Sequence, residues 1–340
     1  MIKINNKITF KENGPPNLIA EISCNHCGSK SLLLKHIVQA KKSGADLVKI
    51  QTYEAEDMVV KKNFKIKSGL WKNKNLYNLY KKAQTPFLWH KDAFKLAKKI
   101  GITLFSTPFS ARAFNFLKQF NPDLYKVSSF EITDLNLIKL IAKTKKPIIL
   151  STGLSTIKET IEAIDIIKKY HKKIILMHCV SGYPTPLSEA NLENIDKLKK
   201  LSGINYVGFS DHTKGIYAST IASNYKICVI EKHFILNKKL DSPDKKFSIT
   251  PKEIQTLKSN IHINNLMNSV VKKKSERHSV VFRRSIFSVK DIKKNEPFSK
   301  DNIKCFRPLV GLGANNYFKI LGKKSKKNIK AFSPILKNFI

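Results

Sequence analysis

The stretch VGFSDHTKGIYASTIASNYKICVIEKHF, residues 207–234, decides the fold that we predict for this chain. Two short apolar segments, VGFS and CVIEKHF, enclose a helix-like segment, which gives the order strand, helix, strand. His212 follows the first apolar segment and His233 stands near the end of the second. The same arrangement recurs along the chain. It indicates a parallel sheet with helices between its strands.

Eight apolar segments of this kind occur in the first 234 residues. They lie near residues 17–23, 46–51, 102–106, 124–128, 147–151, 174–179, 205–209 and 227–234. Helical spacing marks the segments between them, as in the stripe formed by Ile157, Ile161, Ile164 and Ile167. Eight strands that alternate with helices predict an α/β fold of the (β/α)8 TIM-barrel type. Active sites of such barrels lie at the carboxyl ends of the strands.

The rest of the chain divides into smaller parts. Residues 1–13 alternate apolar and polar side chains around Asn5-Asn6, which predicts a short hairpin ahead of the barrel. The run VKKKSERHS, 271–279, is charged and without apolar periodicity. Residues 280–340 consist of short apolar segments and turns, close to the smallest size that sustains a core. We predict a barrel domain over 1–268, a linker over 269–279 and a small β-rich domain over 280–340.

The formal charge of +38 raises the possibility of a nucleic-acid-binding protein. Such proteins gather basic residues on one face and rely on arginine, which contacts phosphates and bases with two donors. Only five of the 63 basic residues are arginine here, and the lysines are scattered over most of the predicted helices. We therefore predict no nucleic-acid partner. The alternative would show tight DNA binding with a steep salt dependence.

Membrane and secretion signals are also missing from the sequence pattern. No stretch approaches the roughly 18 consecutive apolar residues of a membrane helix. MIKINNKITFKENG, residues 1–14, lacks the apolar centre of a signal peptide. The five cysteines are too few and too dispersed for a disulfide framework, and the single CxxC at Cys24–Cys27 has no second pair. We predict a cytoplasmic protein with no membrane partner.

His212 and His233 are candidate metal ligands. They end neighbouring predicted strands, and adjacent barrel strands lie about 4.8 Å apart. Two neutral imidazoles at this spacing can hold one divalent cation and leave positions open for water and substrate. With only two protein ligands, an exchangeable Mn²⁺ or Mg²⁺ ion is expected. The alternative is structural: a helix cap at Ser210 or Asp211, and a core histidine at 233.

Lys49 and Lys126 interrupt apolar strands, where a buried ammonium group requires an anion. One interpretation is the binding of phosphate or carboxylate, and the other is a Schiff base, as in lysine-dependent aldolases. Hydroxyl groups at the same predicted strand ends favour anion binding; they belong to Ser106, Thr107, Ser129, Ser181 and Ser210.

Glu21, Glu131 and Asp244 supply carboxylates near the same predicted barrel mouth. In a cationic pocket they can orient water, bind hydroxyl groups or move protons. The alternative is structural pairing with Lys49 or Lys126.

These segments resemble the sialic acid synthase family. The resemblance is carried by AEISCNHCGS, VKIQTY, FSTPFS, YKVSSFEITDLNLI, ILSTGL, SGYPTP, FSDHTKG and VIEKHF, in this order. FRRSIFSVKDIKKNEPFSKDNIKCFRPLVGL resembles the C-terminal antifreeze-like (SAF, β-clip) domain of that family. Asn295 replaces the glycine usual in one turn of this domain, which is compatible because asparagine adopts φ > 0 more readily than most residues.

The resemblance implies a reaction. Phosphoenolpyruvate condenses with the open-chain form of an acetamido sugar, water adds, and phosphate leaves. The family motifs assign metal binding to His212 and His233, and a place near the reacting centre to Glu21. They assign phosphate and carboxylate binding to Lys49, Thr107, Lys126, Ser129, Ser181 and Ser210. Gln51, Tyr183 and Asp244 are expected on the sugar side, and Glu131 is a further candidate contact.

The resemblance also implies a homodimer, in which the small domain of one subunit covers the barrel mouth of the other. Arg307 matches the arginine that reaches the substrate across that interface. LWKNKNLYNLYKKAQTPFLWH and SFEITDLNLIK are most similar to pseudaminic acid synthases, which use 2,4-diacetamido-2,4,6-trideoxy-L-altrose. N-acetylneuraminate and legionaminate synthases, which perform the same chemistry on other acetamido sugars, are the alternative.

Overall fold

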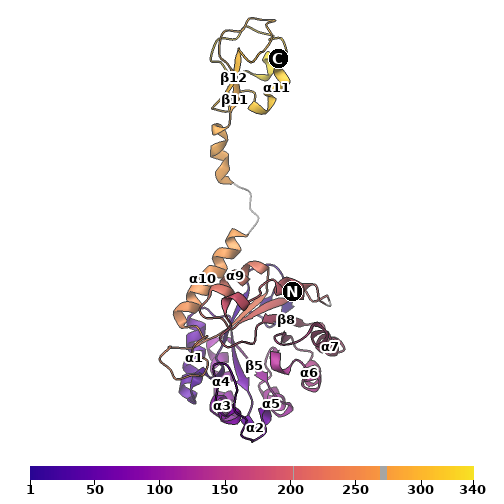
Figure 1. Ribbon diagram of the computed structural model, residues 1–340, viewed down its shortest axis with the longest axis vertical. Helices are drawn as coiled ribbons and strands as arrows, with labels where there is room; N and C mark the ends of the chain where they lie inside the picture. Colours follow the sequence, from indigo (N-terminus) through magenta and orange to yellow (C-terminus); the bar gives the residue numbers. More distant parts are fainter. Residues whose placement is uncertain (202, 269–273) are drawn as a thin grey trace. The chain divides into compact units, whose positions relative to one another are not determined.

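The computed structural model describes residues 1–201, 203–268 and 274–340 (Figure 1). The chain divides into two compact units, Met1–Ser269 and Val270–Ile340. Of the linker predicted over 269–279, residues 269–273 lie outside the described residues. The remainder begins a 3-10 helix, η6 (Lys274–Phe282).

The first unit contains a closed barrel of eight parallel strands, which confirms the predicted fold. The strands follow one another around the barrel in chain order, and the last pairs with the first. They are β3 (Asn17–Glu21), β4 (Leu47–Thr52), β5 (Thr103–Pro108), β6 (Tyr125–Val127), β7 (Ile148–Ser151), β8 (Ile174–Cys179), β9 (Val207–Asp211) and β10 (Val229–His233).

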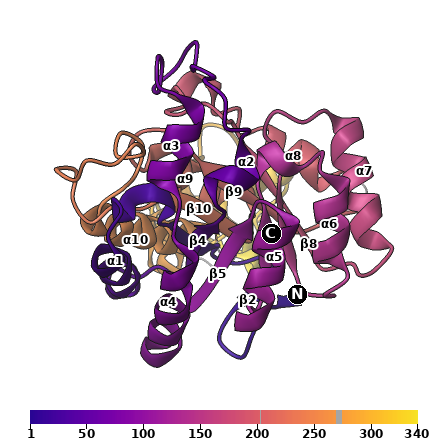
Figure 2. The ribbon, with the colours of Figure 1, turned by 90° about the horizontal axis from the view of Figure 1, so that it is seen from below.

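Helices surround the strands (Figure 2). The α-helices between and after the strands, apart from α2 and α3 described below, are α1 (Lys30–Lys42), α4 (Phe87–Ile100), α5 (Ala111–Leu117), α6 (Leu135–Ala142), α7 (Ile157–Lys168), α8 (Asn194–Lys199), α9 (Tyr217–Ala222) and α10 (Pro251–Met267). Short 3-10 helices are η1 (Ser23–His26), η2 (Lys118–Phe120), η3 (Ser129–Glu131), η4 (Leu187–Glu189) and η5 (Ser223–Tyr225). Side-chain caps such as Thr156 and Thr250 fix where α7 and α10 begin.

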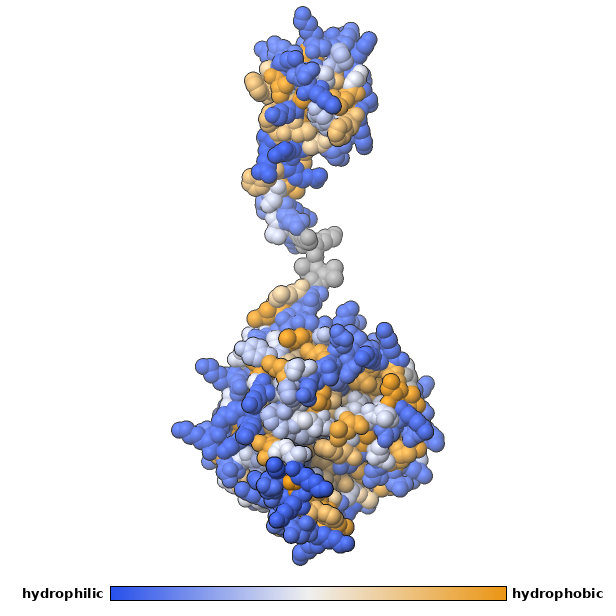
Figure 3. All heavy atoms as spheres, viewed as in Figure 1, coloured by the Kyte–Doolittle hydropathy of each residue, from blue (hydrophilic) through white to orange (hydrophobic). Residues whose placement is uncertain are grey.

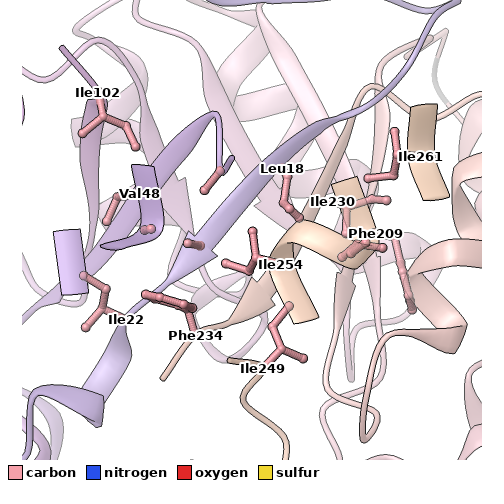
Figure 4. Packing of buried hydrophobic residues seen from close by; sticks show 14 of the residues in the cluster. Leu18, Ile22, Val48, Ile102, Phe209, Ile230, Phe234, Ile249, Ile254 and Ile261 are labelled. Carbon is pink, nitrogen blue, oxygen red and sulfur yellow. The ribbon is translucent and has the colours of Figure 1, made fainter. Parts of the chain in front are cut away.

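The main apolar core lies between the strands and these helices (Figure 4). Leu18 and Ile230 of neighbouring strands belong to the same buried cluster as Ile254 and Ile261 of α10. In α7, Ile164 and Ile167 are buried as the predicted stripe requires, but Ile157 is exposed. The stripe therefore extends one turn beyond the part of the helix that packs on the barrel.

A second cluster fills the barrel interior at its amino-terminal end. The hairpin of β1 (Ile2–Lys3) and β2 (Thr9–Phe10) contributes Ile2 and Phe10 to this cluster. They lie with strand residues such as Leu47 and Phe105. Because the interior is filled with apolar side chains at this end, polar groups are left for the carboxyl ends of the strands.

Two short helices interrupt the long connection between β4 and α4. They are α2 (Ala55–Met58) and α3 (Leu76–Ala83), joined by a loop whose strand-like bridge pairs Lys65 with Asn75. This insertion contributes to the site described below.

The second unit has its own core of Ile286, Ile292, Phe298, Ile303 and Ile320. Its antiparallel pair is β11 (Ser285–Ser288) and β12 (Ile303–Phe306), with η7 (Ala314–Asn316), α11 (Tyr317–Ile320) and η8 (Lys337–Phe339) beside it in the chain. Asn295 has φ +71°, as expected for a residue at a glycine position.

Hydrophilic side chains are spread over the visible surface of each unit (Figure 3). Within the described ranges, no helix combines the length and apolar character needed to span a bilayer.

Candidate active site

A cavity of about 480 Å³ opens at the carboxyl ends of the barrel strands. Twelve of the fourteen predicted site residues line it, and they come from every strand of the barrel or the turn after it except β7. They are Glu21, Lys49, Gln51, Thr107, Lys126, Ser129, Ser181, Tyr183, Ser210, His212, His233 and Asp244. The register explains their convergence, since Glu21 lies level with His233 on one side and Lys49 on the other.

Glu231 is the centre of a buried charge network at the floor of the cavity. Its Oε1 accepts hydrogen bonds from Lys49 Nζ at 2.9 Å and Lys126 Nζ at 3.1 Å. Burial alone would raise the pKa of Glu231, but the two lysines outweigh it and lower that pKa. The carboxylate is therefore ionised and holds two ammonium groups side by side at the floor.

Hydroxyl groups surround these ammonium groups. Thr107 Oγ1 and Ser151 Oγ are shielded from solvent and lack a hydrogen-bond partner among the described residues. Ser129 Oγ lies 2.8 Å from Ser181 Oγ, beside Gly153, where an added Cβ would lie only 2.4 Å from Ser181 Oγ. Hydroxyl donors next to paired ammonium groups suit a phosphate or carboxylate group.

Glu21 lies between this network and the histidines. Its Oε1 accepts a hydrogen bond from Gln51 Nε2 at 2.9 Å, and its Oε2 lies 3.5 Å from Lys49 Nζ without a hydrogen bond. Burial raises the pKa of Glu21, against the opposing effect of Lys49. A carboxyl group with a raised pKa beside the reacting centre can give or take a proton.

His212 and His233 face each other, with ring centroids 5.5 Å apart. Burial, followed by the charge of His233, lowers the pKa of His212 to about 3, so its imidazole is neutral. His212 Nδ1 donates to Val180 O at 2.9 Å, which leaves the lone pair on Nε2. His233 Nδ1 lies 3.2 Å from Asp244 Oδ2.

These two imidazoles fit a weakly held divalent cation. In the part of the chain that the structure describes, no group of three or more His, Cys, Asp or Glu side chains could hold a metal. An ion here would therefore take its remaining ligands from water and substrate. The carboxylate of Asp244, 3.2 Å from His233 Nδ1, would orient that ring toward the ion.

Aromatic rings extend outward from the histidines. The ring of Tyr183 lies 4.4 Å from that of His212, and the ring of Trp71 lies 5.6 Å from Tyr183 on the other side. Trp71 belongs to the insertion between β4 and α4. The cavity thus changes from charged at the floor to aromatic and apolar toward the insertion.

Two of these fourteen residues do not line the cavity, and neither does Ser106, whose Oγ donates to Ile50 O at 2.9 Å. Glu131 lies in η3, where its carboxylate accepts a hydrogen bond from Ser128 Oγ. Arg307 is exposed and follows β12 in the second unit. The proposed contact of Arg307 with substrate stays a prediction.

Comparison with known proteins identifies the family. The profile of the NeuB family matches residues 36–273, and the SAF domain profile matches 283–340. The chain belongs to the NeuB family. This confirms the predicted sialic acid synthase resemblance and the antifreeze-like second domain, and it makes the chain a synthase-type enzyme.

NeuB relatives cover nearly all of the chain. A pseudaminic acid synthase of Campylobacter jejuni subsp. jejuni serotype O:2 is 41% identical, over 92% of this chain and 93% of its own length. An N,N'-diacetyllegionaminic acid synthase of the same organism is 38% identical, over 92% of this chain and 96% of its own length. The crystal structure of an N-acetylneuraminic acid synthetase from Leptospira borgpetersenii, in complex with citrate, has a TM-score of 0.73 and 30% identity. The match covers 81% of this chain and 94% of that protein.

Among the polar cavity residues outside the predicted set are Ser151, Cys179 and Glu231. Alternation along a strand provides a signal for two of them, because residues two apart share a face. Glu231 stands two before His233 on β10, and Cys179 stands two before Ser181. The apolar side chains of α3 have no such signal.

Proposed function

We propose that this protein is a pseudaminic acid synthase. It condenses phosphoenolpyruvate with 2,4-diacetamido-2,4,6-trideoxy-L-altrose and releases pseudaminate and phosphate. The observation that carries this proposal is the arrangement of Lys49, Lys126 and unpartnered hydroxyl groups below two facing imidazole rings in one cavity. The 41% identity to a pseudaminic acid synthase supports the choice of sugar.

The floor of the cavity suits the phosphate and carboxylate groups of phosphoenolpyruvate. Lys49 and Lys126 share the single carboxylate Glu231, so their charge is not fully compensated by it. An ammonium group held in an ion pair has no free lone pair for attack on a carbonyl group. Burial opposes the charged form of both lysines; at Lys49 the carboxylates of Glu21 and Glu231 outweigh it and raise the pKa, whereas the pKa of Lys126 is lowered. The ion-pair argument therefore favours anion binding over a Schiff base at Lys49.

A divalent cation on His212 and His233, Mn²⁺ or Mg²⁺, would supply Lewis-acid polarisation of the sugar aldehyde. The protein side chains do the rest. Lys49 and Lys126 orient phosphoenolpyruvate so that its methylene carbon faces the aldehyde carbon. Gln51 and Tyr183 lie on the side where the sugar chain extends.

Bond formation between the methylene and aldehyde carbons leaves a cationic centre at the second carbon of phosphoenolpyruvate. The aldehyde oxygen becomes an alkoxide in the same step, and the Glu21 carboxyl group, whose pKa burial raises, is placed to protonate it. Water then adds to the cationic centre and returns a proton to the Glu21 carboxylate. The tetrahedral intermediate collapses to the keto acid as its carbon–oxygen bond to phosphate breaks, and its hydroxyl proton leaves with the phosphate. The buried lysines stabilise the phosphate that leaves.

The active unit in this proposal is a homodimer in the cytoplasm, where phosphoenolpyruvate is available. An apolar rim of Phe130, Leu154, Ile157 and Leu187 follows strands β6, β7 and β8, and each of these side chains is more than half exposed. The SAF domain of the partner subunit would cover this rim and bring Arg307 to the substrate. Exclusion of water would protect the cationic centre.

Phosphate release from phosphoenolpyruvate tests the proposal. Purified protein with Mn²⁺ receives the diacetamido-altrose, N-acetylmannosamine or no sugar, each with and without chelator. We expect release with the altrose derivative alone, abolished by chelator. Release with N-acetylmannosamine alone would assign the protein to the neuraminate synthases instead.

A further inference from the structure

Helix α3 has an apolar stripe that faces the catalytic cavity. Leu76, Leu79, Tyr80 and Ala83 follow the spacing of one helix face, and all four line the cavity. No residue of α3 is fully buried. The stripe is therefore only partly covered by protein, and the space it faces is the substrate cavity.

The loop before α3 continues the same wall. Ile66, Leu70 and Trp71 line the cavity next to the stripe. Backbone hydrogen bonds close the loop, from Leu76 N to Phe64 O at 2.9 Å and from Ile66 N to Lys74 O at 3.0 Å. We define the apolar wall as these three loop residues and the four of the α3 stripe. Its shape is fixed before a ligand arrives.

The apolar wall lies beyond Tyr183 as seen from the histidines. His212 contacts Tyr183, and Tyr183 contacts Trp71, so the wall is one aromatic ring farther out than the position of the aldehyde. An open-chain sugar with its first carbon at the histidines directs its later carbons toward the wall. The polar side-chain atoms of the wall are the Tyr80 hydroxyl group and Trp71 Nε1, which has no hydrogen-bond partner among the described residues. Against the aliphatic side chains, hydroxyl groups on those carbons would lose hydrogen bonds to water, whereas methyl groups would gain contact.

We propose that the apolar wall is a specificity subsite for the methyl groups at the far end of the sugar, on the carbon-4 acetamido group and at carbon 6. This inference rests on the proposed function and names what selects its substrate. Each methyl group in a fitted apolar pocket contributes about 10- to 200-fold in kcat/KM. The wall therefore selects a 6-deoxy, diacetamido sugar over one that carries hydroxyl groups at carbons 4 and 6.

Substitution of Leu79 tests the subsite. Leu79→Asn keeps the branched shape and the number of side-chain heavy atoms but places an amide in the wall, and Leu79→Ala removes contact without adding a polar group. Both are compared on the diacetamido sugar and on 2-acetamido-2-deoxy-altrose, which has the two hydroxyl groups. Tyr77→Phe is the control, because Tyr77 lies on the same helix outside the cavity and donates to Glu56.

For Leu79→Asn we expect kcat/KM for the diacetamido sugar to fall by about 10- to 200-fold. The kcat/KM for the hydroxylated sugar and the KM for phosphoenolpyruvate should stay within about threefold of the wild-type values, which corresponds to about 0.6 kcal/mol. The kcat/KM of Leu79→Ala for the diacetamido sugar should lie between the values for Leu79→Asn and the wild type. That of Tyr77→Phe should match the wild type. Equal losses on both sugars, or no loss, would overturn the subsite.

A binding measurement separates the subsite from the reaction. The chain has two tryptophans, so Trp89→Phe leaves Trp71 as the only one. Trp89 packs beside His26 and does not line the cavity. With inorganic phosphate present, the diacetamido sugar should change Trp71 emission saturably, and the hydroxylated sugar should not at equal concentration. A change in Trp71 emission without turnover would refute the proposed reaction but support the subsite. Turnover without a change in Trp71 emission would refute the subsite.

Discussion

Nζ of Lys49 lies 2.9 Å from Oε1 of Glu231, although their strands β4 and β10 are separated in the barrel by β3. The pair therefore reaches across the barrel interior, and Lys126 of β6 reaches the same carboxylate from another side. Three strands are linked by one anion. Without it, Lys126 would be an unpaired cation in a low-dielectric interior, and Lys49 would keep only Glu21 Oε2, at 3.5 Å.

Replacement of this anion should destabilise the barrel. Glu231→Gln leaves the buried ammonium group of Lys126 without a carboxylate partner and that of Lys49 with only Glu21 Oε2, at 3.5 Å. We expect the free energy of unfolding to fall by about 3–5 kcal/mol. Inorganic phosphate should restore part of the loss, because it would bind the same ammonium groups. Urea unfolding with and without phosphate measures both effects. Glu56→Gln, which breaks an exposed pair with Lys81, is the control. Unchanged stability of Glu231→Gln would contradict this network.

Loss of either histidine should abolish metal-dependent turnover while the barrel stays folded. His212→Ala and His233→Ala each remove one of two candidate ligands, and we expect kcat/KM to fall by about 10³-fold, or about 4 kcal/mol. Manganese binding followed by electron paramagnetic resonance gives a readout that does not depend on activity. Full activity or unchanged Mn²⁺ affinity in either variant would exclude this metal site.

Three buried histidines near α1 and α4 should make stability depend on pH. Burial lowers the pKa of each of His26, His36 and His90 to about 4, from an ordinary value of 6.5. The unfolded chain therefore takes up protons first as the pH falls. Stability is complete above about 6.5 and is lost toward 4, with each histidine approaching about 1.4 kcal/mol per pH unit.

Denaturant unfolding at about pH 7 and about pH 5 measures this loss. His36 accepts a hydrogen bond from Leu236 N through Nε2 and donates through Nδ1 to Leu32 O, so protonation must break the former. His36→Gln removes one titrating group and should reduce the pH dependence by less than a third, because burial lowers the pKa of His212 and His178 as well. A flat stability profile in the wild type would disprove the assignment of neutral histidines.

Arg307→Ala should impair catalysis, and complementation in mixed dimers can tell whether Arg307 acts on its own subunit or on the partner. If the SAF domain acts on the partner subunit, mixed dimers of Arg307→Ala with the inactive His212→Ala barrel contain one intact combination of barrel and arginine. We expect such dimers to recover up to about half of the wild-type activity per active site, and to do so only after subunit exchange. Dimers shown to be mixed but inactive would favour an arginine that serves its own subunit.

The sequence by itself determined the barrel, because eight short apolar segments with intervening helical spacing leave few other arrangements. It also located polar residues such as Lys126 and His233, since a carboxyl strand end can be read from the chain. Only the tertiary structure decided how these groups pair. The contact of Lys49 with Glu231 joins residues 182 positions apart, and it depends on closure of the barrel.

The other differences between the predicted site and the observed one also arise from tertiary packing. Leu79 of α3 lines the cavity and Glu131 of η3 does not, because a loop or helix can turn any of its faces toward the site. Strand periodicity fixes which face of the barrel a residue occupies, whereas no local pattern fixes the orientation of an insertion. The sequence determined the catalytic floor through strand alternation, and packing in three dimensions decided the wall that faces the sugar.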